Sequence, residues 1–401
     1  MTHLTPDTRR AIVLLSFATF ASMAAQRICD AMLPELARVF DTGLAQAAQV
    51  VSMFAMVYGV SQLFYGPLGD RLGKYRVIGW ATLGCSVGSI LAVFAPTLEL
   101  LVAARMLVAL GAAAIIPLSL AWIGDNVVYE LRQATLARVG LGTTLGITGG
   151  QLFGGLLTDT LGWRWAFVFM TVVFGSVGWL LIRDWRRQQA SRAAPGDAPL
   201  PAVRHGFVRQ ALLILTGRWS RIVLIVAFLE GAAGFGVLAI WAAHLHQAGG
   251  LSLTLAGAIV SLFGLGGMLY MALAGRVIRR LGEIRMVRLG VAGAGLAMGV
   301  ISLWPQWAPT LLASPLAGFG FFMFHNTMQV NATQMAPAAR GTGVSLFAAA
   351  LFLGQSAGVG LAAVLVTRIG SAATIALGGV VLVVVGQLFA LALQRRDALM
   401  G

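Results

Sequence analysis

The sequence predicts an all-α, polytopic membrane protein with twelve transmembrane helices in two pseudo-symmetric six-helix bundles. Its composition is the first reason, because 58% of the 401 residues are hydrophobic and only 10% are charged, whereas soluble domains are about 25% charged. The second reason is that runs such as 372–393 are apolar on every face. The strands of a membrane β-barrel would instead alternate apolar and polar residues. These runs therefore predict helices that cross a bilayer.

Charges, prolines and glycines divide the first part of the chain into apolar runs, and a helix needs about 20 such residues to cross a bilayer. We expect helices at 11–33, 47–68, 77–95, 98–122, 137–158 and 164–182. The first run follows the segment MTHLTPDTRR and contains Arg27 and Asp30. It also lacks a clear small-residue cleavage site, so it is interpreted as a retained helix and not as a signal peptide.

Six more helices are expected after a polar stretch, at 220–243, 252–275, 286–304, 308–330, 342–366 and 371–394. This layout predicts an N-terminal bundle over 1–182, a basic linker over 183–219 and a C-terminal bundle over 220–401. The linker contains several arginines and prolines, among them Arg186 and Arg187. Its basic residues could contact anionic lipid headgroups, but orientation of the chain by charge is the favoured explanation.

The basic residues predict the topology. Of the 28 Lys and Arg residues, 23 lie in the N-terminal segment, the even-numbered loops and the C-terminal segment, while the odd-numbered loops hold only Arg38, Arg164 and Arg368. Arg27 and Arg105 lie within helices. Because basic loops stay on the cytoplasmic side, we expect a multi-pass protein of the inner (plasma) membrane with both termini in the cytoplasm.

An internal repeat relates the two halves. A shift of 209 residues superposes Gly66 on Gly275, Gly73 on Gly282, Pro96 on Pro305 and Gly111 on Gly320, and a shift of 208 superposes the segments 145–150 and 353–358. The consistent offset predicts a duplicated bundle. Transporters built from such repeats place the substrate between them and move one repeat against the other.

The turn between the second and third helices, GPLGDRLGKYR at 66–76, resembles the signature loop of the major facilitator superfamily. Within that superfamily, the segment 30–34, Arg105 and the segment 162–164 resemble the twelve-helix drug/proton antiporters. In the fifth helix, Gln151 stands where the antiporter motif has a proline. The resemblance implies transport by alternating access, proton coupling and a monomeric functional unit.

The same turn is the expected cytoplasmic gate, formed by Gly66, Asp70, Arg71, Gly73 and Lys74. The glycines permit tight backbone geometry, and Asp70 can accept hydrogen bonds from a helix N-terminus in the other half. The resemblance implies a latch that stabilises the outward-open state. A basic loop that only sets topology is the alternative, and it explains the carboxylate poorly.

Four ionisable side chains fall inside predicted helices, where an unpaired charge is costly: Arg27, Asp30, Arg105 and Glu230. Burial disfavours a charged carboxylate and a nearby cation favours it, so a carboxylate whose neighbours change can take up and release a proton. We assign proton carriage to Asp30 or Glu230 and coupling to Arg105, with Arg27 and Arg105 as possible partners of Asp30. The alternatives are mutual neutralisation of Arg27 and Asp30 and a static hydrogen bond from Glu230.

Two groups of residues are candidates for the substrate path. Tyr58, Trp122, Phe235 and Trp241 could form an aromatic cavity, although positions facing lipid are equally consistent with them. His325, Asn326 and Gln329 form a polar cluster on the tenth helix, where His325 and Gln329 share a face. Gly146, Gly150 and Gly154 form a stripe that permits close helix packing, and the resemblance places this stripe between the two halves.

The sequence therefore predicts a secondary active transporter that exports a small amphipathic or organic solute in exchange for protons, with the proton gradient as its energy source and no cofactor. A proton symporter or uniporter that imports a small metabolite, such as a sugar or organic anion, is the nearest alternative. A membrane receptor or scaffold without transport is a third possibility. No Walker loop, catalytic constellation, clustered metal ligands or nucleic-acid partner is expected, and the partners are the solute, protons and the bilayer.

Overall fold

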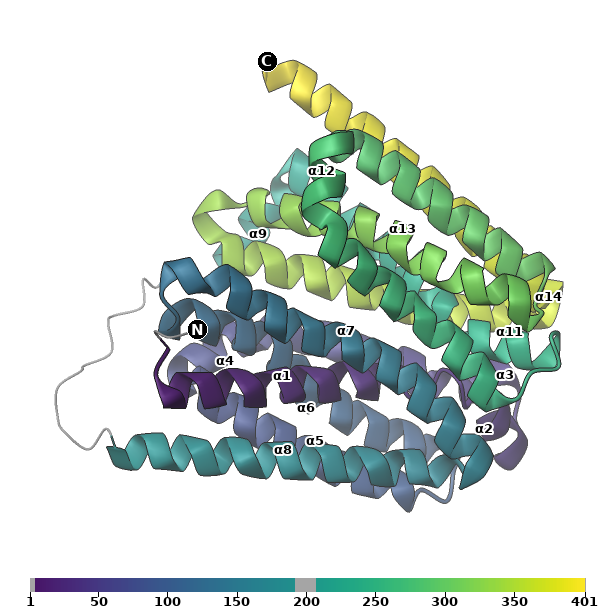
Figure 1. Ribbon diagram of the computed structural model, residues 1–401, viewed down its shortest axis with the longest axis horizontal. Coiled ribbons are helices and arrows are strands. Elements are labelled where there is room, and N and C mark those ends of the chain that lie inside the picture. Colours follow the sequence, from purple (N-terminus) through teal and green to yellow (C-terminus); the bar gives the residue numbers. More distant parts are fainter. Residues whose placement is uncertain (1–3, 192–206, 401) are drawn as a thin grey trace.

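The computed structural model describes residues 4–191 and 207–400, and every regular element in those residues is a helix. Figure 1 shows two bundles side by side, with the N-terminal half in purple to teal below and the C-terminal half in green to yellow above. The predicted all-helical fold class is thus confirmed. The part of the predicted linker at 192–206 lies outside the described residues.

The N-terminal half contains α1 (Pro6–Arg27), α2 (Leu33–Val39), α3 (Leu44–Ala47), α4 (Gln49–Leu72), α5 (Lys74–Val93), α6 (Leu98–Asn126), α7 (Tyr129–Thr160) and α8 (Trp163–Ser191). A side chain at the N-cap can satisfy one of the free backbone N–H groups at the start of a helix. Thr5 caps α1 and Thr97 caps α6 in this way. The short α2 and α3 connect the end of α1 to α4, so α1 ends earlier than the predicted 11–33.

The C-terminal half contains α9 (Phe207–Thr216), α10 (Arg218–Glu230), the π-helix η1 (Gly231–Gly236), α11 (Trp241–Gln247), α12 (Leu253–Leu303), α13 (Trp307–Gln334), the 3₁₀-helix η2 (Pro337–Ala339) and α14 (Arg340–Met400). The predicted helix 220–243 is divided among α10, η1 and α11. The predicted linker 183–219 is partly helical, because α8 runs to Ser191 and α9 precedes α10.

Eight helical segments of the described chain are long and apolar enough to cross a bilayer. Two of these, α12 and α14, bend at Gly282 and Gly370 and so supply two crossings each. The remaining crossings are α1 and α7, which pack against each other, while α7 also packs against α12. Helices that contact other helices more than lipid can hold more glycine and polar residues, which explains their lower hydropathy.

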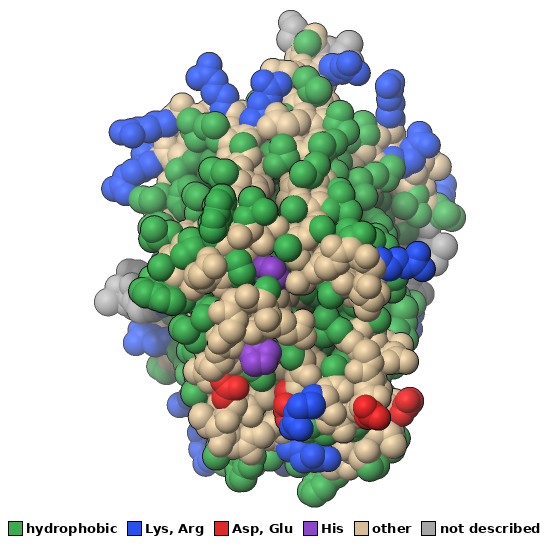
Figure 2. Space-filling model, turned by 90° about the vertical axis from the view of Figure 1, so that its right-hand side faces the viewer, with side chains coloured by type: hydrophobic (Ala, Val, Ile, Leu, Met, Phe, Trp, Pro, Cys, Tyr) green, Lys and Arg blue, Asp and Glu red, His purple; other side chains and the backbone are tan. Residues whose placement is uncertain are grey.

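The two ends of the bundle differ in charge. The end that holds the N-terminus and α9 carries the arginines of both repeated turns, and we call it the basic end; α2, α3 and α11 lie at the opposite end (Figure 1). Figure 2 faces the opposite end, where acidic side chains gather in the lower part of the view, over the N-terminal half. In the predicted topology, the basic end is the one that faces the cytoplasm.

The internal repeat holds at the level of backbone geometry. Gly73 and its counterpart Gly282 both adopt positive φ, at 88° and 67°, and so do Gly162 and Gly370, at 99° and 85°. The helix contacts repeat as well, because Gly146 packs on the carbonyl oxygen of Phe20. The residues 208 positions later, Gly354 and Phe228, make the same contact. Only glycine readily adopts these turn conformations, so the turns preserve the duplication.

The expected role of the glycine stripe is wrong in one respect. A Cβ atom at Gly146, Gly150 or Gly154 would meet the backbone of α1, at Phe20, Ala24 and Ile28 respectively. Because α1 and α7 belong to the same half, the stripe holds that half together and does not form the contact between halves.

The contact between the halves is made elsewhere on the same helices. Gly155 of α7 packs on Leu253 of α12, Gly257 of α12 packs on Gln151 of α7, and Gly59 of α4 packs on Phe352 of α14. One face of α7 thus packs against its own half, and a neighbouring face packs against the other half.

We expect Gly354→Ala to lower the stability of the purified protein by about 1–3 kcal/mol, because the added methyl group would collide with the Phe228 carbonyl group of a tightly packed helix pair. Gly360→Ala on the same helix is the matched control. A Cβ at Gly360 meets open space, so this change should be neutral or slightly stabilising. Thermal unfolding in detergent measures both, and equal melting temperatures for the two variants would contradict the packing argument.

Candidate functional site

A buried ion pair forms where α1 ends. Arg27 is the last residue of α1, where a cation is favoured by the helix dipole, and Asp30 lies in the turn that follows. Their side chains are buried, with 3.3 Å between Arg27 Nη1 and Asp30 Oδ2. Gln151 Nε2 of α7 donates a second hydrogen bond to Asp30 Oδ2 at 2.7 Å. Asp30 Oδ1 is buried without a hydrogen-bond partner among the described residues.

This ion pair also touches the other half. Arg27 Nη1 donates to the carbonyl oxygen of Phe235 in η1 at 3.2 Å, and its guanidinium carbon lies 4.7 Å from the centre of the Phe235 ring. Next to it, Gln26 Nε2 donates to Gln355 Oε1 of α14 at 3.2 Å. The charged group at the end of α1 therefore lies at the contact between the two halves.

Arg105 is buried but is not the partner of Asp30. Its Nη1 donates to the carbonyl oxygen of Ala25 at 2.7 Å, its Nε donates to that of Val50 at 3.4 Å, and its guanidinium lies 4.1 Å from the centre of the Phe54 ring. The Arg105–Asp30 pair, one of the two that the sequence left open, does not form among the described residues in this conformation. Arg105 instead joins α6 to α1 and α4.

A second buried acid pairs with a histidine in the C-terminal half. Glu230 Oε1 lies 2.7 Å from His325 Nδ1, and Gln329 Nε2 lies 3.1 Å from His325 Nε2. The imidazole of His325 thus lies between the Glu230 carboxylate and the Gln329 amide. Glu230 Oε2 is buried without a partner among the described residues.

Phenylalanine rings surround His325, the partner of this second acid. The ring of Phe321 stacks on His325 at 5.8 Å between centres, and those of Phe235, Phe322 and Phe347 lie 5.9–6.1 Å from it. Phe235 thus contacts Arg27 on one side and His325 on the other. The sequence placed Glu230 and His325 in separate groups, because nothing local indicates that residues 95 positions apart will meet.

The expected aromatic cavity is not formed by its four predicted residues. Tyr58 is buried, with its ring 4.5 Å from that of Phe352 across the contact between halves. Trp241 is buried in the core of the C-terminal half. Asn326, from the predicted polar cluster, donates from Nδ2 to the hydroxyl of Tyr270 at 3.0 Å. These residues lie in different places because helix rotation, which hydropathy does not fix, decides where each ring points.

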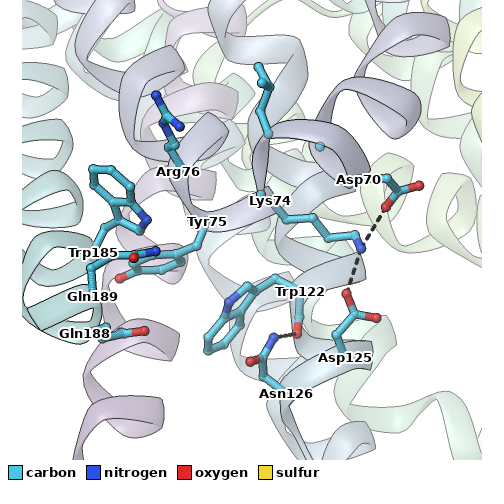
Figure 3. Close-up of a pocket in the computed structure, with 13 residues that line it drawn as sticks. Asp70, Lys74, Tyr75, Arg76, Trp122, Asp125, Asn126, Trp185, Gln188 and Gln189 are labelled. Atoms are coloured by element: carbon cyan, nitrogen blue, oxygen red, sulfur yellow. Dashed lines mark hydrogen bonds and ion pairs between the residues drawn. The ribbon is translucent and has the colours of Figure 1, made fainter. Parts of the chain in front are cut away.

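Trp122 lies instead at the basic end, in a cavity of about 620 Å³ beside the predicted gate. Figure 3 shows it next to Tyr75, with 5.5 Å between ring centres, and shows Lys74 between two carboxylates. Lys74 Nζ lies 2.9 Å from Asp70 Oδ1 and 2.7 Å from Asp125 Oδ2. The sequence did not identify Asp125, which follows the apolar run at the end of α6.

The gate residues make no hydrogen bond or ion pair to the other half within the described chain. Asp70 is about half exposed and bonds only to Lys74 of its own half, and Arg71 is exposed. Gly73 makes the turn with a φ of 88°, and Gly66 has open space around it. The latch expected at the basic end is therefore open in this conformation.

The opposite end, by contrast, is closed. Asp159 Oδ2 of α7 accepts hydrogen bonds from the backbone N–H of Thr254 at 2.5 Å and from its hydroxyl at 2.7 Å, in the first turn of α12. With the bonds of Gln26 and Arg27, these contacts lie between mid-membrane and the opposite end. The conformation is thus closed at the opposite end, while Asp70 and Lys74 at the basic end bond within their own half.

Both buried acids have an incompletely satisfied environment. Each half holds a buried carboxylate with one unpartnered oxygen, and a buried polar group without a partner is costly. Protonation of Asp30 would remove its attraction for Arg27, which binds both Asp30 and the other half. The site can therefore link a change of charge to the contact between halves. Among the described residues, no cluster of His, Cys, Asp and Glu side chains is arranged to hold a metal ion.

Comparison with known proteins agrees with this architecture. The family model of the Major Facilitator Superfamily matches residues 15–359. Among curated proteins, the uncharacterized MFS-type transporter YwfA of Bacillus subtilis is 22% identical over 286 residues, which is 71% of this chain and 68% of YwfA. The multidrug export protein EmrB of Escherichia coli is 26% identical over 163 residues, which is 41% of this chain but only 32% of EmrB.

A solved structure shows the same fold. The bacterial homologue of the human lysosomal transporter Spinster, in an inward-facing and unoccupied conformation, superposes with a TM-score of 0.70 and 17% identity, over 97% of this chain and 96% of that chain. At this identity the likeness concerns the fold alone.

We expect Arg27→Leu to destabilise the protein by about 3–5 kcal/mol, because it leaves Asp30 buried without its cation. The double variant Arg27→Leu/Asp30→Leu should recover most of this stability without recovering transport, since neither member of the pair is then charged. Thermal unfolding in detergent measures the three proteins. A single variant as stable as wild type would show that Asp30 carries no charge in this conformation.

Proposed function

This chain belongs to the Major Facilitator Superfamily, and on that premise we propose that it exports a small amphipathic or organic solute in exchange for protons. The EmrB relative, a multidrug export protein, supports export. The charge difference between the ends supports an orientation with the basic end and both termini in the cytoplasm, in the inner (plasma) membrane. The functional unit in this proposal is a monomer driven by the proton gradient, with no cofactor.

The observation that carries the proposal is the group formed by Arg27, Asp30 and Gln151 at the contact between the halves. Arg27 bonds to Asp30 and to Phe235 of the other half, while Asp30 keeps one unpartnered oxygen. In our mechanism, opening of the opposite end separates Arg27 from Phe235 and admits a proton to Asp30. Return to the present conformation re-forms the ion pair and releases that proton at the basic end, where solute enters for the next cycle.

The direction of transport distinguishes the proposed exporter from a symporter or uniporter that imports a metabolite. The absence of transport would identify a receptor or scaffold. The direct bond from Gln151 to Asp30 keeps the import alternative relevant, because this glutamine replaces the proline of the antiporter motif. Glu230 is the alternative proton carrier. Its described hydrogen-bond partner lies within its own half, so its charge is less directly linked to opening.

We expect Asp30→Asn to lower the rate of solute-dependent proton release at least about tenfold. The amide keeps the shape of the carboxyl group but cannot exchange a proton. The measurement uses acid-loaded, inside-out vesicles, with ethidium, glucose and succinate as probes of a cationic drug, a sugar and an organic acid. Asp41→Asn is the matched control, since Asp41 is exposed and has a positive φ that asparagine tolerates.

Glu230→Gln tests the alternative proton carrier in the same assay. The glutamine oxygen can still accept from His325, so we expect proton release to persist at a reduced rate. Loss of coupling in Glu230→Gln with normal coupling in Asp30→Asn would transfer the proton-carrying role to Glu230. Solute movement without proton movement in the wild type would favour a uniporter, and no solute movement would favour the receptor or scaffold.

We further expect Asp159→Asn to favour the conformation that is open at the opposite end, because a neutral amide caps the N-terminus of α12 less well than a carboxylate. The readout is the labelling of Ala31→Cys by a membrane-impermeant maleimide, in a Cys29→Ser/Cys85→Ser background. Ala31 is buried and lies next to Gly257 of the other half. Labelling should accelerate several-fold in Asp159→Asn but not in Asp41→Asn, and equal rates would show that this contact does not hold the end closed.

A further inference from the structure

The outer face of α8 changes from apolar to strongly basic near its end. Its exposed side chains Trp165, Val172 and Trp179 recur every seven residues, so they lie on one side of the helix. Arg183, Arg186 and Arg187 continue that side beyond Trp179, and all three are exposed. Figure 1 shows α8 along the outer edge of the N-terminal half, with its C-terminal end projecting at the basic end.

These arginines line a surface cleft of about 340 Å³, together with Trp179, Ile182 and Ala190. The guanidinium carbon of Arg183 lies 5.2 Å from the centre of the Trp179 ring, which fixes one basic group over the aromatic wall. Among the described residues, this lining contains three arginines and no acid. The nearest acid in sequence, Asp184, is buried on the inner side of α8, where Tyr75 and Gln188 donate to it at 2.9 and 2.8 Å.

We propose that this cleft binds the phosphate group of an anionic phospholipid from the adjacent leaflet. Arginine suits a phosphate because its planar group can donate two parallel hydrogen bonds to the phosphate oxygens. The apolar part of the cleft, at Trp179 and Ile182, continues into the lipid-facing stripe of α8, where an acyl chain can lie. A tryptophan at the headgroup level, with basic residues just beyond it, is the arrangement found where helices leave a bilayer.

The shape of the cleft favours a lipid over a soluble anion. A free phosphate would use the arginines alone, whereas a phospholipid also uses the aromatic and aliphatic wall that lies toward the membrane core. This site is separate from the Asp30 group, which lies near the opposite end of the molecule, so its occupancy can be tested without reference to transport.

The test is lipid binding to the purified full-length protein in a neutral detergent, measured by native mass spectrometry. The probes are dioleoylphosphatidylglycerol, dioleoylphosphatidylcholine and sodium phosphate. Wild type should bind phosphatidylglycerol in preference to phosphatidylcholine. Arg183→Gln/Arg186→Gln/Arg187→Gln should weaken the binding of phosphatidylglycerol by about 100-fold, since each basic residue at an anionic surface contributes roughly fivefold.

The matched control is Arg276→Gln/Arg279→Gln/Arg280→Gln, which removes the same charge from exposed arginines of the basic turn in the other half. It should bind phosphatidylglycerol as wild type does. An equal loss in both triple variants, no preference for phosphatidylglycerol, or equally tight binding of free phosphate would overturn the proposal. If the glutamine variant fails to fold, the variant with three lysines keeps the charge but loses paired hydrogen bonding, and unchanged binding by it would also overturn the proposal.

Discussion

Burial of the ion pair between Arg27 and Asp30 is the constraint on which the surrounding structure depends. Two charges in a low-dielectric interior depend on further hydrogen bonds to offset the cost of removing them from water. The partners come from two directions, because Gln151 of α7 binds Asp30 and the Phe235 carbonyl group of the other half binds Arg27. Gly150 lets α7 approach α1 closely enough for Gln151 to reach. One oxygen of Asp30 has no hydrogen-bond partner among the described residues, and the proposed mechanism places the proton there.

The duplicated halves preserve backbone geometry but not charge. At a shift of 208 residues, Arg27 corresponds to Phe235, Asp30 to Leu238 and Glu230 to Ser22. The contacts of Gly146 and Gly354 with the carbonyl groups of the facing helices are nevertheless the same. Packing of helices against each other thus constrains small residues in both copies, while the ionisable groups are placed individually. The candidate chemistry lies in this asymmetry, where Phe235 of one half meets the charged group of the other.

The contacts between the halves are distributed unevenly along the membrane normal. Hydrogen bonds donated by Gln26 and Arg27 and accepted by Asp159 hold the opposite end together, whereas Asp70 and Lys74 at the basic end bond within their own half. A carrier that works by alternating access needs contacts at each end that are strong in one conformation and absent in the other. In the proposed mechanism, the charged turn at the basic end and the capped N-terminus of α12 at the opposite end supply these two sets of contacts.

The sequence by itself determined the fold class, the places of the twelve crossings, the repeat and the basic turn, because hydropathy, charge and glycine turns are local properties of the chain. It could not determine that Asp30 pairs with Arg27 and Gln151 and not with Arg105, or that Glu230 meets His325. It also assigned the stripe of Gly146, Gly150 and Gly154 to the wrong neighbour. These outcomes depend on the rotation of each helix about its own axis and on the break in α1 after Arg27. Only tertiary packing decides both, because a uniformly apolar helix has no sequence feature that tells one neighbour from another.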